Sequence, residues 1–558
     1  MLGKNIKIKH VCLILTCIMF VTSSWMSIID NVRGRLSQKD SLFNIRNQGN
    51  CLYLMQTNFD DCILRNDCDN LTDYQYSYLQ KPFLKNNLQT GKYINDFEEV
   101  LDSKVSGYKY SRDGSETAGN HDPILIIGND DFTSENGVTG GNGTTEDPYI
   151  IENWVIIGNG STEAGIYVGS TTAAFVVRNC SISEFDDEFF KGIYFYNVTE
   201  GKIKDVEAFN NYYGIFIEQS SFISVENCVC HDNYGVYATG IKVFCSHHII
   251  ITDCECYRMR CSLTQIAACG IVLGNSAYCQ IRNSTCHLNK RYGIYLYLSR
   301  DTEHPLQYNV IENCTIYKNE CGGIEVFMSF GLTWKEAKDV RHGYNHISNC
   351  VVYDNGHLNA PVMNSGPGIS LYEIDDSIVE NCILYENGVG VEITNSCNNH
   401  ISNCTMYNHW QPMFAGVGVR IRDGGDPFWE VTHNNTVEHC DIFDQHVGIS
   451  IFSGFQTTIR NNNIYNQTLY GIDVYRVFSP SMGVIHGNNI YNNTDGNNFY
   501  GWSFFDARDN WWGSSLGPSR SPGHFRGDVI WTRLGIAVCL RFPWATKPFV
   551  DAGVIYRE

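Results

Sequence analysis

The sequence predicts an all-β fold, a single-stranded right-handed parallel β-helix of about 12 or more coils with a cap at each end. Three observations predict it. A Gly-apolar-x-apolar motif recurs twelve times, and a second motif, apolar-x-Asn-Cys-x-apolar, recurs between its copies. The composition combines 50 Gly and 33 Tyr with only 13 Pro, which is typical of a turn-rich β protein.

The first motif sets the spacing of the coils. Its copies span 306 residues in 11 intervals, about 28 residues each. They begin at Gly165, Gly192, Gly214, Gly240, Gly270, Gly293, Gly323, Gly368, Gly390, Gly418, Gly448 and Gly471. Apolar residues alternate with period two, which indicates strands. One repeat of about three short strands cannot enclose a core, so each must stack on its neighbours, about 4.8 Å away.

The second motif places one cysteine in most coils. The apolar residue two positions later shares the cysteine's parity, so both are expected to point inward. The cysteines in this register are Cys180, Cys228, Cys254, Cys314, Cys350, Cys382, Cys404 and Cys440. Buried cysteine behaves as a small hydrophobe, and the asparagine before it suits a left-handed turn.

Four cysteines leave other interpretations open. Cys228 and Cys230 stand in one coil, and Cys254 and Cys256 stand in the next. They are expected to be inert core thiols, but such a patch could also form a disulfide or hold Zn or Cu(I). Met- or His-rich clusters, which would favour copper, are missing from the sequence around them.

The N-terminal segment is expected to be a targeting sequence. Three lysines precede an apolar run at residues 11–21, followed by Ser23 and Ser24. Residues 1–29 are therefore expected to be a signal peptide or an N-terminal membrane anchor, which places the protein outside the cytoplasm, secreted or at the cell surface. Residues 30–120 read as an irregular spacer, 121–160 as the N-terminal cap and first coil, 161–500 as the β-helix, and 501–558 as the closing coil and tail.

The charge balance excludes one class of partner. The chain carries 40 Lys+Arg against 60 Asp+Glu, a formal net charge of −20. Nucleic-acid binding needs clustered cations, so no nucleic-acid partner is expected. Contact with a membrane is expected only through the N-terminal segment.

The repeats resemble those of the pectin-lyase-like superfamily. That group includes carbohydrate-binding proteins, sugar hydrolases and periplasmic NosD-type proteins. Residues 123–157, with Gly140-Gly141-Asn142-Gly143, resemble the first coil of archaeal surface members, and Asp509-Asn510-Trp511-Trp512-Gly513 resembles their closing coil. The resemblance implies the fold and, more generally, a carbohydrate ligand.

One outward face has the composition of a glycan-binding surface. In each Gly-apolar-x-apolar strand, the x residue and the residue after the second apolar position point outward. These two columns place aromatic rings beside carboxylates and arginines. The residues expected to bind substrate are Tyr297, Phe327, Tyr372, Phe452, Tyr475 and Asp473. Aromatic faces stack on sugar rings and carboxylates bind hydroxyls; cross-strand stacking that only stabilises the sheet is the alternative.

Two chemistries fit the coils of residues 293–430. Glu325 and Glu392 stand two coils apart, about 9–10 Å, close to the separation of about 6.5–9.5 Å in inverting glycosidases, and Glu373 could replace one of them. The resemblance implies the second chemistry: lyases of that superfamily use Ca²⁺ on Asp clusters with Arg or Lys nearby, and Arg420, Arg422, Asp423 and Asp426 have that composition. No complete catalytic motif of either class is present, so no cofactor is firmly expected. Trp334 and Trp429 lie in insertions beside these coils.

The leading hypothesis is therefore a secreted or surface-tethered β-helix that binds polysaccharide along this face. A polysaccharide lyase or glycoside hydrolase is the first alternative. A structural surface protein, or a NosD-like protein that handles metal, is the second.

Overall fold

A computed structural model describes residues 119–261, 268–299, 305–328, 343–356, 366–410, 416–423, 432–452, 454–519, 527–533 and 537–555. Within these residues the chain winds through twelve successive coils, and the corresponding strands of adjacent coils pair in parallel. Each coil contributes one strand to each of three sheets. The predicted parallel β-helix is confirmed.

The first sheet contains the Gly-apolar-x-apolar strands. They are β2 (Ile124–Ile127), β6 (Ala164–Gly169), β9 (Lys191–Tyr196), β12 (Tyr213–Glu218), β15 (Thr239–Phe244), β18 (Cys269–Gly274), β21 (Tyr292–Leu298), β24 (Gly322–Met328), β27 (Pro367–Tyr372), β30 (Val389–Thr394), β33 (Val417–Arg422) and β36 (Val447–Ile451).

The second sheet follows the first in each coil. Its strands are β4 (Tyr149–Glu152), β7 (Phe175–Arg178), β10 (Gly201–Lys204), β13 (Ile223–Glu226), β16 (Ile250–Thr252), β19 (Gln280–Arg282), β22 (Val310–Glu312), β25 (His346–Ser348), β28 (Ile378–Glu380), β31 (His400–Ser402), β34 (Thr436–Glu438) and β37 (Thr457–Arg460). Two long strands, β39 (Tyr470–His486) and β41 (Asn497–Asp506), run through both the first and the second sheet.

The third sheet carries the strands that follow the Asn-Cys turn. They are β1 (Gly119–Asn120), β5 (Trp154–Ile157), β8 (Ser181–Ser183), β11 (Glu207–Phe209), β14 (Val229–His231), β17 (Glu255–Tyr257), β20 (Thr285–His287), β23 (Thr315–Tyr317), β26 (Val351–Tyr353), β29 (Ile383–Tyr385), β32 (Thr405–Tyr407), β35 (Asp441–Phe443), β38 (Asn463–Tyr465) and β40 (Asn489–Tyr491).

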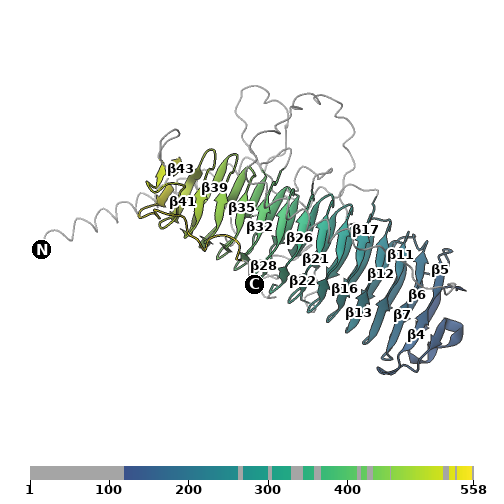
Figure 1. Ribbon diagram of the computed structural model, residues 1–558. Helices are drawn as coiled ribbons and strands as arrows, with labels where there is room; N and C mark the ends of the chain where they lie inside the picture. Colours follow the sequence, from purple (N-terminus) through teal and green to yellow (C-terminus); the bar gives the residue numbers. More distant parts are fainter. Residues whose placement is uncertain are drawn as a thin grey trace, which may run out of the picture. The chain divides into compact units, whose positions relative to one another are not determined.

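Short elements lie at the two ends of the stack. At one end, η1 (Asn129–Asp131) and η2 (Ser134–Asn136) precede β3 (Val138–Gly140), which pairs antiparallel with β4. At the other end lie β42 (Pro518–Ser519), β43 (Gly527–Arg533) and β44 (Ala537–Leu540). Figure 1 shows the coils stacked along one axis between β4 and β43.

The core runs continuously through the inside of the coils. Isoleucines of consecutive first-sheet strands align, as Ile166, Ile193 and Ile215 do, and each is fully buried. The eight cysteines of the predicted register are buried and free. The thiols of Cys228 and Cys254 each donate to a backbone carbonyl 3.2 Å away. These thiols therefore serve as small core side chains, as predicted.

Two sets of asparagines shape the turns. The asparagines before the core cysteines adopt the left-handed conformation, as at Asn179 (φ 51°) and Asn227 (φ 49°), which confirms the prediction for these turns. A second, buried set was not predicted: Asn289, Asn319 and Asn355 each donate from Nδ2 to the Oδ1 of the asparagine in the next coil, at 2.9–3.0 Å. This amide ladder satisfies buried backbone carbonyls as well.

The predicted targeting segment, residues 1–29, lies outside the described residues, and so does the predicted spacer, residues 30–120, except for its last two residues, which form β1. Asp426, Trp334 and Trp429 also lie outside them. Among the described residues, no helix is long and apolar enough to cross a membrane.

Candidate functional site

The outer face of the first sheet brings the predicted residues into two straight columns. Ile324 and Val326 of β24 are fully buried, so the residues that alternate with them point outward. In the first column, Tyr295, Glu325, Ser370, Glu392 and Arg420 pair in order from strand to strand.

The second column lies two residues further along each strand. Tyr297, Phe327, Tyr372, Thr394 and Arg422 pair in the same order. The second column is therefore aromatic over β21–β27 and continues with Thr394 and Arg422 on β30 and β33, beside a first column that carries Glu325, Glu392 and Arg420. The strand period predicted that these residues point outward.

Glu392 is the most buried charged group in this face. Its side chain is only 5% exposed, and its Oε1 lies 3.0 Å from Arg422 Nε and 3.5 Å from Arg420 Nη1. Arg422 Nε also donates to the Thr394 hydroxyl at 3.2 Å. A buried carboxylate needs such compensation, because an unpaired charge would be costly. The cluster fixes two guanidinium groups on the floor of the face.

Glu325 lies in a different environment, two strands away from Glu392. Burial raises the pKa of Glu325 to about 6, with a smaller contribution from the charge of Glu392, while the Tyr292 hydroxyl and the Arg291 guanidinium oppose the rise. Glu325 therefore holds a proton at mildly acidic pH, whereas Glu392 is paired with arginines. Two carboxyl groups in contrasting environments are the arrangement that acid–base chemistry uses.

The aromatic column is partly exposed. The rings of Phe327 and Tyr372 lie 5.0 Å apart at an angle of 35°. Tyr297 packs 6.4 Å from Phe244, across the position of Gly274. Tyr297 also stacks on Tyr295, with ring centroids 5.3 Å apart. Tyr297, Phe327 and Tyr372 are each only partly buried, so part of each side chain faces outward.

Two predicted catalytic residues occupy turns instead of the columns. Glu373 follows Tyr372 in the left-handed conformation (φ 56°), and Asn395 Nδ2 donates to its Oε1 at 3.5 Å. Burial raises the pKa of Glu373. Asp423 Oδ1 accepts the backbone N–H of Thr432 at 2.8 Å, so it holds together the two ends of the connection after β33.

The remaining predicted binding residues lie further along the same face. Asp473 follows Ser450 in the first column, and Asn498 donates to it at 2.8 Å. Phe452 and Tyr475 are exposed, with ring centroids 5.8 Å apart. They extend the face beyond the arginine cluster.

Two cations of this face were not singled out in the sequence. Lys242 Nζ lies 4.5 Å from the ring centroid of Tyr213 and 4.9 Å from that of Phe216, and burial lowers its pKa to about 8. Arg291 lies over the rings of Tyr292 and Tyr295. Within the described residues, neither Lys242 nor Arg291 forms a salt bridge. The position of Lys242 in the outward column could have pointed to it in the sequence. Arg291 directly precedes β21, outside the repeated motif, so the motif could not have pointed to it.

A longer aromatic ladder, also not predicted, covers the outside of the third sheet. Successive rings lie 4.7–5.2 Å apart and 2–10° from parallel. The ladder consists of Phe209, His231, Tyr257, His287, Tyr317, Tyr353, Tyr385, Tyr407, Phe443, Tyr465 and Tyr491. Because each ring covers its neighbour, the faces that would stack on a sugar are occupied. This ladder is best explained as sheet stabilisation.

The cysteine patch shows only core packing. Cys228, Cys230, Cys254 and Cys256 are free and fully or almost fully buried. In the part of the chain that the structure describes, no group of three or more His, Cys, Asp or Glu side chains could hold a metal ion. The sequence-based expectation that these are core thiols agrees with their burial.

The chain belongs to a family of right-handed β-helix proteins: the family described as "Right handed beta helix region" matches residues 103–258, 191–338 and 339–511. No curated protein matches the sequence. The resemblance to archaeal surface members stays a prediction.

Solved structures that match include three named for tailspike or alginate-related proteins. The Dettilon tailspike protein (gp208) shares 12% identity at a TM-score of 0.42; the match covers 60% of this chain and 61% of the tailspike, less than two thirds of its length. The Azotobacter vinelandii mannuronan C-5 epimerase AlgE6 A-module shares 15% identity at 0.33, over 64% of this chain and 87% of the module. An alginate lyase from Paenibacillus sp. str. FPU-7 shares 12% identity at a TM-score of 0.35; the match covers 60% of this chain and 97% of the lyase.

Proposed function

We propose that the protein binds a polysaccharide along the outer face of the first sheet, across β21–β33. The observation that carries this proposal is the placement of three aromatic rings, on β21–β27, beside the carboxyl and guanidinium groups of the same outward face. The rings of Tyr297, Phe327 and Tyr372 offer apolar surface for the C–H faces of sugar rings, and Glu325 and Arg422 offer hydrogen bonds to hydroxyl groups.

Unsatisfied groups in the face support a ligand there. The Tyr295 hydroxyl is buried and has no hydrogen-bond partner among the residues that the structure describes. Buried polar groups are nearly always satisfied by protein, water or ligand. Arg291, beside it, also lacks a salt bridge within the described residues. A polar ligand in the face would supply partners for both.

Binding fits the geometry better than turnover. Glu392 is occupied by two guanidinium groups and is almost fully buried, so no water can be readily activated by it. Its role in the proposal is to hold Arg420 and Arg422 in place for the ligand. The position of Glu373 in a turn, outside the Glu325 column, removes the simplest replacement base.

Glycoside hydrolysis is the second candidate function, and one observation favours it. The raised pKa of Glu325, about 6, suits a general acid that protonates a leaving oxygen. Lyase chemistry, with Ca²⁺ as its cofactor, is the weaker alternative because Asp423 is engaged with Thr432.

We further propose that the protein acts outside the cytoplasm, secreted or held at the surface by residues 1–29. The proposal rests on the basic and apolar segments at the start of the sequence. A protease-protection assay on intact cells tests it: the β-helix should be digested by external protease.

The decisive experiment compares retention and turnover on the same glycans. The protein is passed over immobilised neutral and acidic polysaccharides, with and without Ca²⁺, while reducing ends and unsaturated-uronate absorbance are followed. Phe327→Ala and Tyr372→Ala should each weaken retention by about tenfold, and Phe222→Ala, an exposed ring on another face, should not.

The three outcomes separate the hypotheses. Retention without products supports a binding protein. Products that vanish in Glu325→Gln, with retention preserved, make the protein an enzyme. Neither retention nor products would refute both proposals and leave a structural rod.

A further inference from the structure

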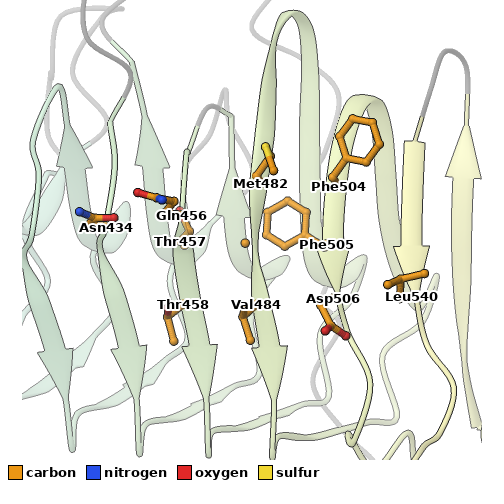
Figure 2. Close-up of a pocket in the computed structure, with 11 residues that line it drawn as sticks. Asn434, Gln456, Thr457, Thr458, Met482, Val484, Phe504, Phe505, Asp506 and Leu540 are labelled. Carbon is orange, nitrogen blue, oxygen red and sulfur yellow. The ribbon is translucent and has the colours of Figure 1, made fainter. Parts of the chain in front are cut away.

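A second concave surface lies far along the chain from the columns, on the outer face of the second sheet. The hollow has a volume of about 580 Å³, within the range of about 300–1,000 Å³ typical of small-ligand sites. Figure 2 shows Thr458, Val484 and Asp506 in line across β37, β39 and β41, with Leu540 of β44 beyond them. The sequence motifs gave no reason to expect a site here.

Two phenylalanines line the hollow, and the ring of Phe504 is the exposed one. Phe504 is 40% exposed, and it makes no ring contact with the described residues. The exposed ring of Phe222 is different: it is 60% exposed but stacks on His248 at 5.0 Å. Phe504 thus offers a ring face, and the exposed side chains of Val484 and Leu540 extend its apolar surface.

Polar side chains border the apolar surface. Gln456 and Thr458 line the hollow, and within the described residues their side chains make no hydrogen bond. Asp506 also lines it, and its carboxylate lies 2.6 Å from Arg508 Nη2 and 3.2 Å from His486 Nε2. Hydrogen bonds from Arg508, and secondarily from His486, hold the pKa of Asp506 well below its usual range. Asp506 therefore remains a fixed, ionised acceptor.

We propose that this hollow binds a neutral carbohydrate unit of one or two sugars. A pyranose has an apolar C–H face, which fits Phe504, Val484 and Leu540, because the negative face of an aromatic ring attracts C–H groups. Its hydroxyl groups fit the amide of Gln456, the hydroxyl of Thr458 and the carboxylate of Asp506.

The charges select an uncharged ligand. Asp506 is the carboxylate that lines the hollow, and Arg508 already neutralises it. Unlike the first-sheet face, the hollow has no cation among its lining residues that could receive an acidic sugar. The site is separate from the first-sheet columns, and the inference does not rest on the proposed function.

Saturation-transfer difference NMR on the full chain tests the inference. The probes are maltose, cellobiose, lactose and mannobiose at millimolar concentration. At least one should give signals from its ring C–H protons. Phe504→Ala and Phe504→Leu should each weaken its binding by about tenfold, and Thr458→Ala by about threefold. Phe504→Leu retains apolar bulk, so it isolates the ring face and guards against a folding defect.

Two control variants make the result specific. Phe222→Ala removes an exposed but stacked ring, and Tyr372→Ala removes a ring of the first-sheet face; both should bind the disaccharide like the unaltered protein. Absence of signal from every disaccharide would overturn the inference. Full binding by Phe504→Leu, or loss of binding in Tyr372→Ala, would overturn it equally.

Discussion

At the scale of single residues, the first-sheet face contains two carboxyl groups with opposite roles. Glu392 is paired with Arg420 and Arg422, and Glu325 is desolvated enough to hold a proton near pH 6. They share one column, so the difference comes from their neighbours. Arginines lie one strand beyond Glu392, whereas tyrosines border Glu325.

Removing one arginine should leave Glu392 undercompensated. Arg422→Met is expected to lower the free energy of unfolding by about 2 kcal/mol, less than the loss for a wholly unpaired buried charge because Arg420 remains. Adding Glu392→Gln should restore part of the loss, as measured by urea unfolding. Arg460→Met removes an exposed guanidinium from Glu438 but leaves His400 paired with it, so it should cost less than about 1 kcal/mol. Strictly additive losses for Arg422→Met and Glu392→Gln would contradict this coupling.

The protonation of Glu325 should appear in the pH dependence of stability. Its folded pKa, about 6, lies above the ordinary value of 4.5. Below pH 4.5 the group is protonated in both states. As the pH rises toward 6, the unfolded chain releases its proton first, so stability falls, and the loss is complete above that range.

Denaturant unfolding at several pH values measures this effect. Glu325→Gln should remove a fall of about 1–2 kcal/mol between pH 4.5 and pH 7, since one pKa unit corresponds to about 1.4 kcal/mol. Glu146→Gln, at an exposed position, should leave the fall unchanged. An identical pH dependence in Glu325→Gln and the unaltered protein would show that Glu325 has an ordinary pKa.

At the scale of strands and turns, much could be predicted from period and spacing. The alternation within each Gly-apolar-x-apolar strand predicted which residues point outward, and the pairing of Glu325 with Ser370 and of Ser370 with Glu392 follows directly from it. The partner of each charge could not be predicted in this way. Arg291 lies outside the motif, yet its charge opposes the rise in the pKa of Glu325. Glu373 lies in a turn rather than in the columns, because its backbone is left-handed.

The third-sheet ladder also depends on geometry that single repeats do not reveal. An aromatic residue stands three positions after seven of the eight cysteines in the core register, Cys180 being the exception, and five of the seven are tyrosines. The parallel stacking of these rings requires the register between coils. That register covers the ring faces, so an aromatic column that looks like a sugar platform in sequence serves to stabilise the sheet.

Replacing one ring of that ladder should therefore affect stability alone. Tyr385 stacks on Tyr353 at 4.8 Å and on Tyr407 at 5.1 Å. Tyr385→Ala should lower the free energy of unfolding by about 1–3 kcal/mol, because two aromatic contacts are lost. Tyr385→Phe retains the ring, so it should retain most of that stability. Retention on polysaccharide should not change in either variant. Weaker retention by folded Tyr385→Ala would place the glycan on the third sheet instead.

At the scale of the whole molecule, the stack is built from contacts between adjacent coils. Each first-sheet strand pairs with the strands one coil before and one coil after it, as β27 pairs with β24 and β30. The core is continuous, but no residue of β27 pairs with a residue of β9. Stability in such a fold is close to a sum of coil terms and neighbour terms.

A cavity in one coil should consequently act over a short range. Ile369 of β27 is fully buried, and Ile369→Ala is expected to cost about 3 kcal/mol. Hydrogen exchange should become faster in β24, β27 and β30, whose backbone bonds join that coil to its neighbours, and should remain unchanged in β9. Ile215→Ala, in β12, is the matched control. It should reverse the pattern: hydrogen exchange should become faster in β9 and remain unchanged in β27. Uniform acceleration in both variants would mean that the coils unfold as one cooperative unit, and the outer face of the first sheet could then not be altered without destabilising the entire stack.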